Sequence, residues 1–474
     1  MRHPTAGITL RLATGAALIV VVAISGSASG TGPGDQASPA GTVTVIASWT
    51  GTKPGTEGYD FRTVLKAFQD ATGVHVIYTG TRALDQLLQS DVQQGSPPDL
   101  AILPSPGELL QYQRQGYLRP LSPSVLAERQ VASAYGPQWL SIMKLGTARL
   151  YTLPVKADLE NLVWYDPRDW PAGSMPGNSS LPSWSRLTAL EKRAAARGGA
   201  TWCLGLDSPP TSGWPGTDWI GNILLAQSGT AVYQRWGDGQ LAWTSPQVEE
   251  AWRTWGSLVA GARQVYGGSA TALVSPWPGP GASVSTEPLF TQPPGCYLQN
   301  AASFITLPYQ ESPNDQRPGI GYDYFPFPST GLPDHATGAV TDAWEVSADL
   351  LAMFRDTPDA ERLVQFLASE QAQRIWPAIP DGGASSADGQ VPLSTYRDQV
   401  SRAVARTLTN HSATLCFNAS DLMPATMQDA FYQAVMEYLG NPEQLANILG
   451  RLDPIRRATY KTFPGGDPDF SCGH

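Results

Sequence analysis

The sequence predicts an α/β protein with a parallel, doubly wound sheet, organised in two lobes. Short apolar runs typical of buried strands alternate with amphipathic helical segments over residues 42–114. This rhythm produces parallel sheets with right-handed crossovers. The chain has 474 residues, of which 42% are hydrophobic, so it can fill well-packed cores but is too long for a single one.

The first three strands are expected at 42–47, 74–78 and 100–103. Between them, apolar residues recur at helical spacing over 61–68, and a second helix is expected at 83–94. In open α/β sheets, ligands bind outside the carboxyl ends of the strands. The residues that directly follow these strands are therefore the first candidates for a binding site.

The rest of the chain reads as a further set of strands and helices. Strands are expected at 151–155, 162–165, 203–206 and 295–305, with an extended proline-rich segment at 324–328. Helices are expected at 108–114, 183–197, 219–227, 246–262, 359–369, 371–376, 396–408, 425–440 and 442–450.

The charge balance excludes one large class of partners. Acidic residues outnumber basic ones by 41 to 31, which gives a formal net charge of -10, and the basic residues form no stripe. Nucleic-acid binding depends on Lys and Arg that neutralise phosphates, so no nucleic-acid partner is expected. The 15 Trp and 17 Tyr residues are abundant enough to serve both as core residues and as stacking surfaces for sugar rings.

Residues 1–30 read as an export signal, because basic residues precede an apolar stretch at 12–24 and small residues follow it. The apolar stretch is shorter than the ~20 residues that a membrane-spanning helix prefers. An uncleaved N-terminal anchor is the alternative interpretation, and 31–41 reads as a flexible linker. The predicted location is outside the cytoplasm: extracellular, on the cell surface or periplasmic.

The four cysteines predict two disulfides, because an even number in an exported chain is typical of oxidised pairs. Three pairings of Cys203, Cys296, Cys416 and Cys472 are possible. No two cysteines have the close spacing of a zinc site and the five His residues are scattered, so no metal is expected. No cofactor is expected either, and the phosphate-loop pattern G-x-x-x-x-G-K is absent from the sequence.

Several runs in a fixed order carry a family resemblance. They lie at 42–51, 78–82, 95–104, 116–121, 153–157, 162–167, 201–205, 213–220, 293–298 and 420–424. Together they make the chain similar to extracellular solute-binding proteins of the maltose type, which are receptors of ABC importers. Within that group, the later runs resemble alpha-glucoside-binding members.

The resemblance implies a periplasmic-binding-protein-like fold with two discontinuous lobes and a hinge. Lobe I would comprise 42–153 and 325–376, and lobe II would comprise 154–324 and 377–474 with a C-terminal extension. Proline lies near each proposed crossing between the lobes, at Leu153-Pro154, at 325–328 and at 376–380. The resemblance also implies the disulfides Cys203–Cys296 and Cys416–Cys472.

A sugar site needs aromatic faces for the C–H surface of the ring and polar side chains for its hydroxyl groups. From the strand ends and the resemblance together, the expected ligand-binding residues are Trp49, Arg82, Lys156, Trp214, Asp218, Trp219, Tyr297, Asp342 and Trp344. Asp342 matches the aspartate of a Gly-Gly-Asp run that is common in the family. This chain has Val340 and Thr341 in place of the two glycines, and Trp344 follows two residues after Asp342.

Alternatives stay open at several of these positions. Trp49 can be a packing residue, and Arg82 can cap a helix. Asp158 or Glu160 can reach the ligand in place of Lys156. The group of Trp214, Asp218 and Trp219 can equally be a helix N-cap between core tryptophans. Glu57 lies in the loop after Trp49, farther along the chain than the acidic residue of the family.

The predicted function is capture of a sugar by hinge closure and its delivery to an ABC permease, by a protein that acts as a monomer. An alternative is a carbohydrate sensor or surface protein without a transport role. A secreted carbohydrate-active enzyme is the weaker alternative, because the sequence has neither G-x-S-x-G nor H-E-x-x-H. We therefore expect no enzymatic activity.

Overall fold

The computed structural model describes residues 41–261, 263–277, 287–310, 316–329, 343–380, 382–462 and 472. The predicted export signal and all but the last residue of the linker lie outside these ranges, as does Asp342. Within the described ranges, no helix has both the length and the apolar character needed to cross a membrane.

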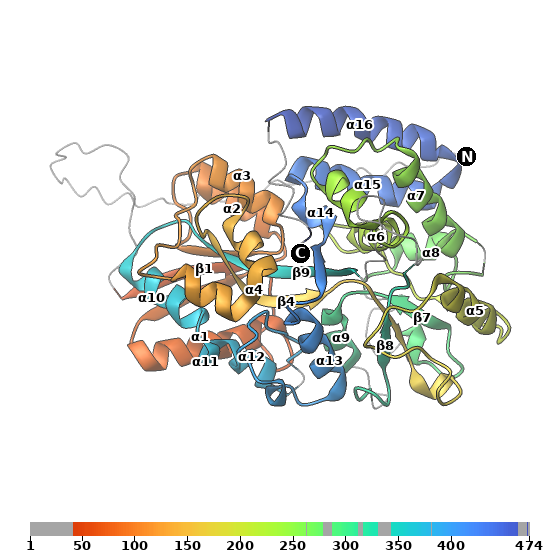
Figure 1. Ribbon diagram of the computed structural model, residues 1–474, viewed down its shortest axis with the longest axis horizontal. Coiled ribbons are helices and arrows are strands. Elements are labelled where there is room, and N and C mark those ends of the chain that lie inside the picture. The colour runs from red at the N-terminus through yellow and green to blue at the C-terminus, as the bar shows by residue number, and fades with distance from the viewer. Residues whose placement is uncertain are drawn as a thin grey trace, which may run out of the picture. The chain divides into compact units, whose positions relative to one another are not determined.

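The first sheet has six strands, and its three N-terminal strands are parallel as predicted (Figure 1). The strand order is β10-β9-β3-β1-β2, and β4 also pairs with β9. The long strand β9 runs antiparallel to β3 and β4, so the sheet is mixed rather than wholly parallel. The strands are β1 (Thr42–Ala47), β2 (His75–Gly80), β3 (Leu100–Leu103), β4 (Thr152–Leu159), β9 (Ala343–Met353) and β10 (Thr414–Phe417).

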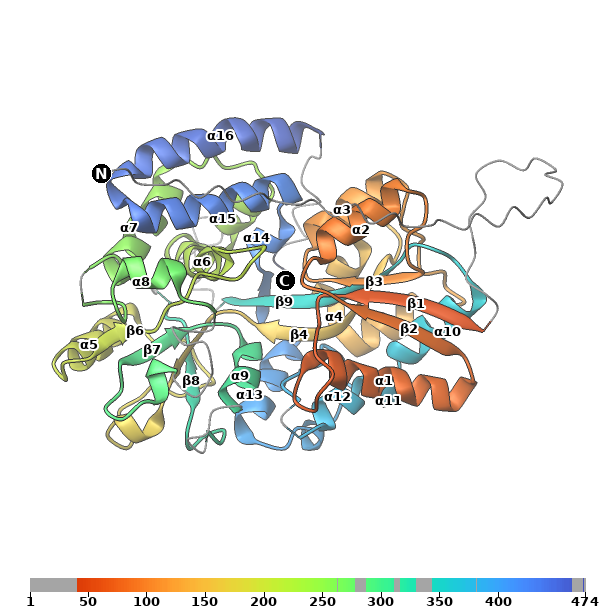
Figure 2. The ribbon, with the colours of Figure 1, turned by 180° about the vertical axis from the view of Figure 1, so that it is seen from behind.

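Helices cover both faces of this sheet, with α2 and α3 on one side and α1, α11 and α12 on the other (Figures 1 and 2). Helix α1 turns Phe61, Val64, Leu65 and Phe68 into the core and ends at Gly73, whose φ of 73° suits a glycine C-cap. The helices of this region are α1 (Glu57–Thr72), α2 (Leu84–Gln93), α3 (Pro106–Arg114), α4 (Glu128–Lys144), α10 (Pro358–Leu367), α11 (Glu370–Gln373), α12 (Ile375–Ala378) and α13 (Gln399–Leu408).

The second sheet has four strands in the order β6-β7-β5-β8. They are β5 (Leu162–Tyr165), β6 (Ala200–Trp202), β7 (Cys296–Asn300) and β8 (Asp323–Pro326). The helices of this region are α5 (Trp184–Ala195), α6 (Trp214–Gly237), α7 (Pro246–Val259), α8 (Ser269–Val274), α9 (Thr306–Gln310), α14 (Ala419–Leu422), α15 (Ala425–Gly440) and α16 (Leu445–Thr462). Short 3₁₀ helices lie at Pro167–Asp169, Pro288–Phe290, Ser303–Ile305, Leu393–Thr395 and Pro442–Gln444.

The chain changes sheets later than the sequence predicts. Pro154 lies inside β4, where a register shift between Pro154 and Lys156 accommodates its missing N–H, and the chain reaches the second sheet only after Glu160. Similarly, Val400 and Leu408 of α13 pack in the core of the first sheet, beyond the crossing predicted at 376–380. The division into two hinged lobes stays a prediction.

Two disulfides join distant segments, and both pairings match the prediction. Cys203 is bonded to Cys296 at the start of β7, and Cys416 of β10 is bonded to Cys472. The second bond ties Cys472 to the strand that leads directly into α14, which contributes to the site described below.

Candidate functional site

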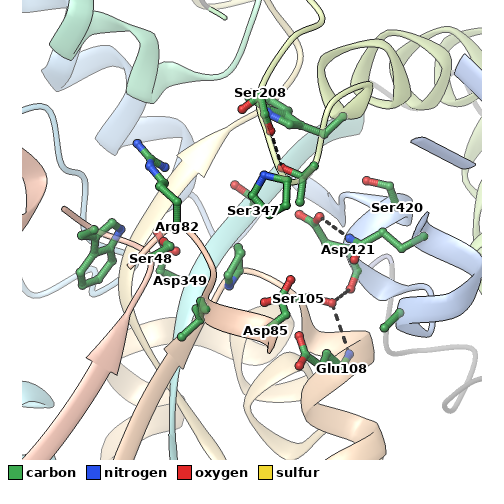
Figure 3. A pocket seen from close by; sticks show the side chains of 18 of the residues that line it. Ser48, Arg82, Asp85, Ser105, Glu108, Ser208, Ser347, Asp349, Ser420 and Asp421 are labelled. Atoms are coloured by element: carbon green, nitrogen blue, oxygen red, sulfur yellow. Dashed lines mark hydrogen bonds between the residues drawn. The ribbon is translucent and has the colours of Figure 1, made fainter. Parts of the chain in front are cut away.

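A pocket of about 910 Å³ lies beyond the carboxyl ends of β1, β2 and β3. This volume falls within the ~300–1,000 Å³ typical of small-molecule sites. Trp49, Arg82 and Ser105, which follow these three strands, line it together with residues of α6 and α14. Figure 3 shows Ser48, Arg82 and Asp349 on one side of the pocket and Ser420 and Asp421 on the other. The location agrees with the expectation from the strand ends.

Helix α3 on one side of the pocket contacts α14 on the other side. The hydroxyl of Ser105, which caps α3, donates to the backbone carbonyl of Asp421 in α14 at 3.0 Å. Gly107 lies so close that a Cβ there would be 2.2 Å from the carbonyl oxygen of Met423. This close approach requires a glycine at position 107.

Alternate residues of β4 and β9 form a double row of polar side chains, which we call the polar ladder. It consists of Lys156 and Asp158 from β4, of Glu160, which directly follows β4, and of Asp349, Ser347 and Glu345 from β9. Lys156 is opposite Asp349, Asp158 is opposite Ser347, and the Glu160 N–H donates to the Glu345 carbonyl at 2.8 Å. Since alternate residues of a strand share a face, the ladder is a direct result of the polar–apolar alternation. All of its members except Glu345 line the pocket.

Lys156 lies at the centre of a buried ion-pair cluster. Its Nζ is 2.6 Å from Glu57 Oε1, 3.6 Å from Asp158 Oδ2 and 3.8 Å from Asp349 Oδ2, and its side chain is 3% exposed. Burial acts to lower the pKa of Lys156, but the three carboxylates outweigh burial and raise it. Burial raises the pKa of Asp349 to about 7, despite the lysine and a hydrogen bond from the Trp49 side chain. Because its pKa is raised, Lys156 stays positively charged at neutral pH.

A second group of carboxyls, Glu160, Asp218 and Asp421, has neutral hydrogen-bond donors. The Ser347 hydroxyl donates to Glu160, and Asn418 Nδ2 donates to Asp218 at 2.9 Å. Burial raises the pKa of Asp421 to about 8, and burial with neighbouring carboxylates raises the pKa of Glu160 and of Asp218 well above their ordinary values. A protonated carboxyl both donates and accepts hydrogen bonds, so this end of the pocket favours a ligand that presents hydroxyl groups.

Glu345 is the buried end of the ladder, and its carboxyl group is hydrogen-bonded to Tyr233. The Tyr233 hydroxyl donates to Glu345 and accepts from the Ala419 N–H at 2.8 Å, which fixes the start of α14. Glu345 is 0% exposed, and its Oε2 has no partner among the described residues. Burial raises the pKa of Glu345 from 4.5 to about 8, although the Tyr233 hydrogen bond lowers it.

Glu345→Gln is expected to flatten the dependence of stability on pH. A raised carboxyl pKa means that the folded state favours the protonated form, so this stability is fully present below pH 4.5 and is lost as pH rises through about 8. Glutamine cannot ionise and still accepts from Tyr233. In urea denaturation, the variant should gain stability relative to wild type between about pH 5 and 8.5. Parallel pH profiles for the two proteins would contradict this assignment.

Three aromatic side chains, Trp214, Trp277 and Phe304, form the aromatic wall of the pocket. Their ring centroids are 5.2 Å apart for Trp214 and Trp277, 6.0 Å for Trp214 and Phe304, and 5.4 Å for Trp277 and Phe304. All three are half-buried, so each still exposes part of its surface. The C–H face of a sugar ring can pack on such a surface.

At the α2 and α3 end, Asp85 and Glu108 lie next to each other (Figure 3). Burial and the neighbouring Asp85 raise the pKa of Glu108 to about 8, and Tyr112 is hydrogen-bonded to Glu108. The two carboxyls are hydrogen-bonded, which requires a proton between them. In the described part of the chain, no group of His, Cys, Asp or Glu side chains is arranged to hold a metal ion.

Five of the predicted ligand-binding residues line the pocket: Trp49, Arg82, Lys156, Trp214 and Asp218. Trp49 is only 2% exposed, because its ring packs edge-on against Phe61 and Trp376. Its indole is thus mainly a core group that also donates a hydrogen bond to Asp349. Contact of these five residues with a ligand stays a prediction.

Three other predicted residues lie in hydrophobic cores and are absent from the pocket lining. Trp219 is fully buried, and its ring packs edge-on against Trp202. Tyr297 packs edge-on against Trp170, and Trp344 is 6% exposed in the core of the first sheet. Core packing takes up these three aromatic rings, and ligand contact at these positions stays a prediction. Asp342 lies outside the described residues.

Several lining residues were not predicted, namely Asp85, Glu108, Trp277, Phe304, Ser347, Asp349, Asn418, Ser420 and Asp421. One signal could have found two of them. Glu345, Ser347 and Asp349 alternate with apolar residues, which is typical of a strand with one polar face. The others have no comparable local signal.

The chain was compared with known proteins and structures. The sequence model of the bacterial extracellular solute-binding protein family matches residues 52–374. The osmoprotective compounds-binding protein of Synechocystis sp. is 32% identical over 400 residues, which cover 82% of this chain and 88% of that protein. The alpha-glucosides-binding periplasmic protein of Rhizobium meliloti is 29% identical over 405 residues, covering 84% and 83%.

Solved structures confirm the fold. A bacterial solute receptor described as having an exclusive preference for β-D-galactopyranose has a TM-score of 0.69 and 15% identity, covering 88% of this chain and 98% of that one. A chitin oligosaccharide binding protein has the same TM-score and identity, covering 89% and 99%. Both neighbours are binding proteins rather than enzymes.

Proposed function

Because the chain belongs to the family of bacterial extracellular solute-binding proteins, we propose that it captures a sugar and delivers it to an ABC import permease. The protein acts outside the cytoplasm, as its family does, and as a monomer. It binds the sugar without converting it. The observation that carries the proposal is one pocket that combines an aromatic wall with a polar ladder.

The two surfaces match the two kinds of surface on a sugar ring. Trp214, Trp277 and Phe304 offer apolar faces for the C–H groups of the ring. Asp158, Glu160, Asp218 and Asp421 offer carboxyl oxygens that can accept hydrogen bonds from hydroxyl groups. A mainly apolar solute would leave these buried acceptors without donors, which costs binding free energy.

The proposed ligand is an alpha-glucoside or another small oligosaccharide. One relative is described as binding alpha-glucosides and another as binding osmoprotective compounds. The lining residues come from elements of both sheet regions, so a ligand can contact both only when these regions are close together. Ligand-driven closure follows from this difference in contact between open and closed states.

A thermal-shift screen over mono-, di- and trisaccharides tests the proposal. A ligand at 100 times its Kd should stabilise the folded protein by roughly 2.7 kcal/mol, which raises the melting temperature measurably. The same mixtures, analysed for products after long incubation, should contain only intact sugar. A protein that is folded but shows no shift with any sugar, or that releases products, would contradict the proposed function.

A further inference from the structure

The loop between β1 and α1, residues 48–56, forms part of the pocket wall. The lining residues of this loop, together with the first residue of α1, are Ser48, Trp49, Thr50, Gly51, Gly55, Thr56 and Glu57. A loop that samples several conformations in the free protein must be ordered when a ligand binds, and this ordering costs binding free energy. The contacts that fix the β1–α1 loop before a sugar arrives therefore contribute to the affinity.

Arg62 of α1 ties the two ends of this loop together from outside the pocket lining. Its Nη1 donates to the carbonyl of Gly51 at 2.7 Å and to the carbonyl of Gly58 at 2.9 Å. Gly51 lies in the first half of the loop and Gly58 in the first turn of α1, so one guanidinium group spans the loop. Arg62 is half-buried and is absent from the pocket lining. Its effect on a bound sugar therefore passes through the loop.

Tyr78 of β2 supports this arginine and holds the start of the loop. The guanidinium carbon of Arg62 lies 4.8 Å from the centroid of the Tyr78 ring, which is a cation–π contact. The Tyr78 hydroxyl donates to the Trp49 carbonyl at 2.7 Å. Burial raises the pKa of Tyr78, so this hydroxyl keeps its proton and stays a donor at neutral pH. The backbone at the start of the loop is thus held from both α1 and β2.

Two glycines let the loop turn back on itself. Gly51 and Gly55 have φ values of 97° and 82°, a region that glycine adopts at little steric cost. The Gly58 N–H then donates to the Thr50 carbonyl at 2.9 Å. Glycine also has the widest choice of other conformations, so it loses the most conformational freedom when it is fixed. A loop with this composition needs a side-chain tie to keep one conformation, and Arg62 supplies that tie.

We propose that Arg62 is a positioning residue for sugar binding, which holds the β1–α1 loop in its ligand-ready conformation before the sugar arrives. The inference rests on the proposed function and adds a residue that does not line the pocket. Glu57 lies in the chain between the two carbonyls that Arg62 holds, and its Oε1 is 2.6 Å from Lys156 Nζ. The same tie therefore also places the carboxylate that is closest to this lysine.

The test is the affinity of Arg62→Met for methyl α-glucoside and for each sugar that raises the melting temperature of the wild type. Binding should weaken at least about tenfold, because the loop must then be ordered by the sugar itself. Arg62→Lys should stay within about threefold of wild type, since an ammonium group can still donate to both carbonyls. Titration calorimetry measures these affinities.

Amide hydrogen exchange tests the order of the loop directly. Without sugar, the Gly58 amide should exchange faster in Arg62→Met than in wild type, and bound sugar should slow it again. Exchange in β3 is the internal reference, because it reports overall stability rather than the state of the loop. A general loss of stability would speed exchange in both places.

Arg402→Met is the matched control. Arg402 is also half-buried and donates to two backbone carbonyls, those of Tyr396 at 2.9 Å and Arg397 at 3.0 Å, but none of these residues lines the pocket. This variant should keep wild-type affinity and wild-type exchange at the loop. Tyr78→Phe, which removes one hydrogen bond to the loop, should weaken binding in the same direction and serves if Arg62→Met does not fold.

The outcomes separate the inference from the proposed function. Wild-type affinity in a folded Arg62→Met variant, or in Tyr78→Phe where Arg62→Met does not fold, overturns the inference while sugar capture stands. An equal loss of affinity in Arg402→Met also overturns it, because the effect would then be one of general stability. Binding of no sugar by the wild type overturns the proposed function as well.

Discussion

Replacing Lys156 with methionine is expected to lower the free energy of unfolding by about 3–5 kcal/mol at pH 7, because it leaves buried carboxylates without their cation. Glu57, Asp158 and Asp349 are 19%, 3% and 13% exposed, so water cannot replace the lysine. As pH falls toward about 5, these carboxyls take up protons in the folded variant and the deficit should shrink. Urea denaturation at several pH values measures both effects.

The matched control is Lys144→Met. Lys144 forms an ion pair with Glu128 at 2.7 Å, close to the 2.6 Å between Lys156 and Glu57, but the two side chains are 23% and 53% exposed. An exposed pair of this kind contributes about 0–1 kcal/mol. If both methionine variants lost similar stability, burial would not be the reason for the strength of the Lys156 cluster. A stability deficit that grew at low pH would equally contradict the argument.

Trp214→Ala is expected to weaken sugar binding by at least about 30-fold, or ~2 kcal/mol, as is typical of a central aromatic contact residue. Trp214 joins the aromatic wall to α6, and Asp218 lies one turn further along the same helix. Removing its indole takes away stacking area and lets water reach the carboxyl of Asp218. Titration calorimetry with a sugar from the thermal-shift screen measures the loss.

Trp184→Ala provides the comparison for that variant. Trp184 is also a half-buried tryptophan at the first turn of a helix, packs against Phe327, and is absent from the pocket lining. It should keep normal affinity while losing a similar amount of thermal stability without ligand. If the Trp214→Ala variant had a much lower melting temperature than the Trp184→Ala variant and still bound sugar normally, Trp214 would be a core residue.

Local patterns in the sequence were sufficient to predict the first three strands of the first sheet. Strands β1, β2 and β3 are short apolar runs followed by polar or glycine-containing turns, and each lies close to its predicted position. The strand-end rule then located Trp49 and Arg82 at the pocket without knowledge of its shape. The apolar face of α1 could also be predicted, because the helical spacing of its apolar residues is a local feature of the sequence.

The residues that the sequence did not reveal depend on long-range pairing. Strand β9 contacts β3, β4 and β10, which are far away in the chain, and its polar face matters only because β4 is next to it. In the sequence alone, Asp349 cannot be distinguished from a surface aspartate. Its role in the ion-pair cluster depends on the pairing that places Lys156 opposite it. The predicted aromatic residues Trp219 and Trp344 show the reverse case, because their surroundings are formed by residues distant in sequence. Trp219 and Trp344 are of the residue type that stacks on sugar rings. Only the packing around them shows that both side chains lie in hydrophobic cores.

The polar ladder has a consequence for how this protein can change. Ala157 and Leu159 of β4, and Ala348 and Leu350 of β9, alternate with the ladder residues and are all buried in the core of the first sheet. Because strand side chains alternate with a period of two, inserting or deleting one residue in either strand would rotate the charged row into that core and the apolar row into the pocket. Exchanges of single side chains along the ladder can therefore tune the ligand, whereas a change in strand length would disrupt binding and folding together.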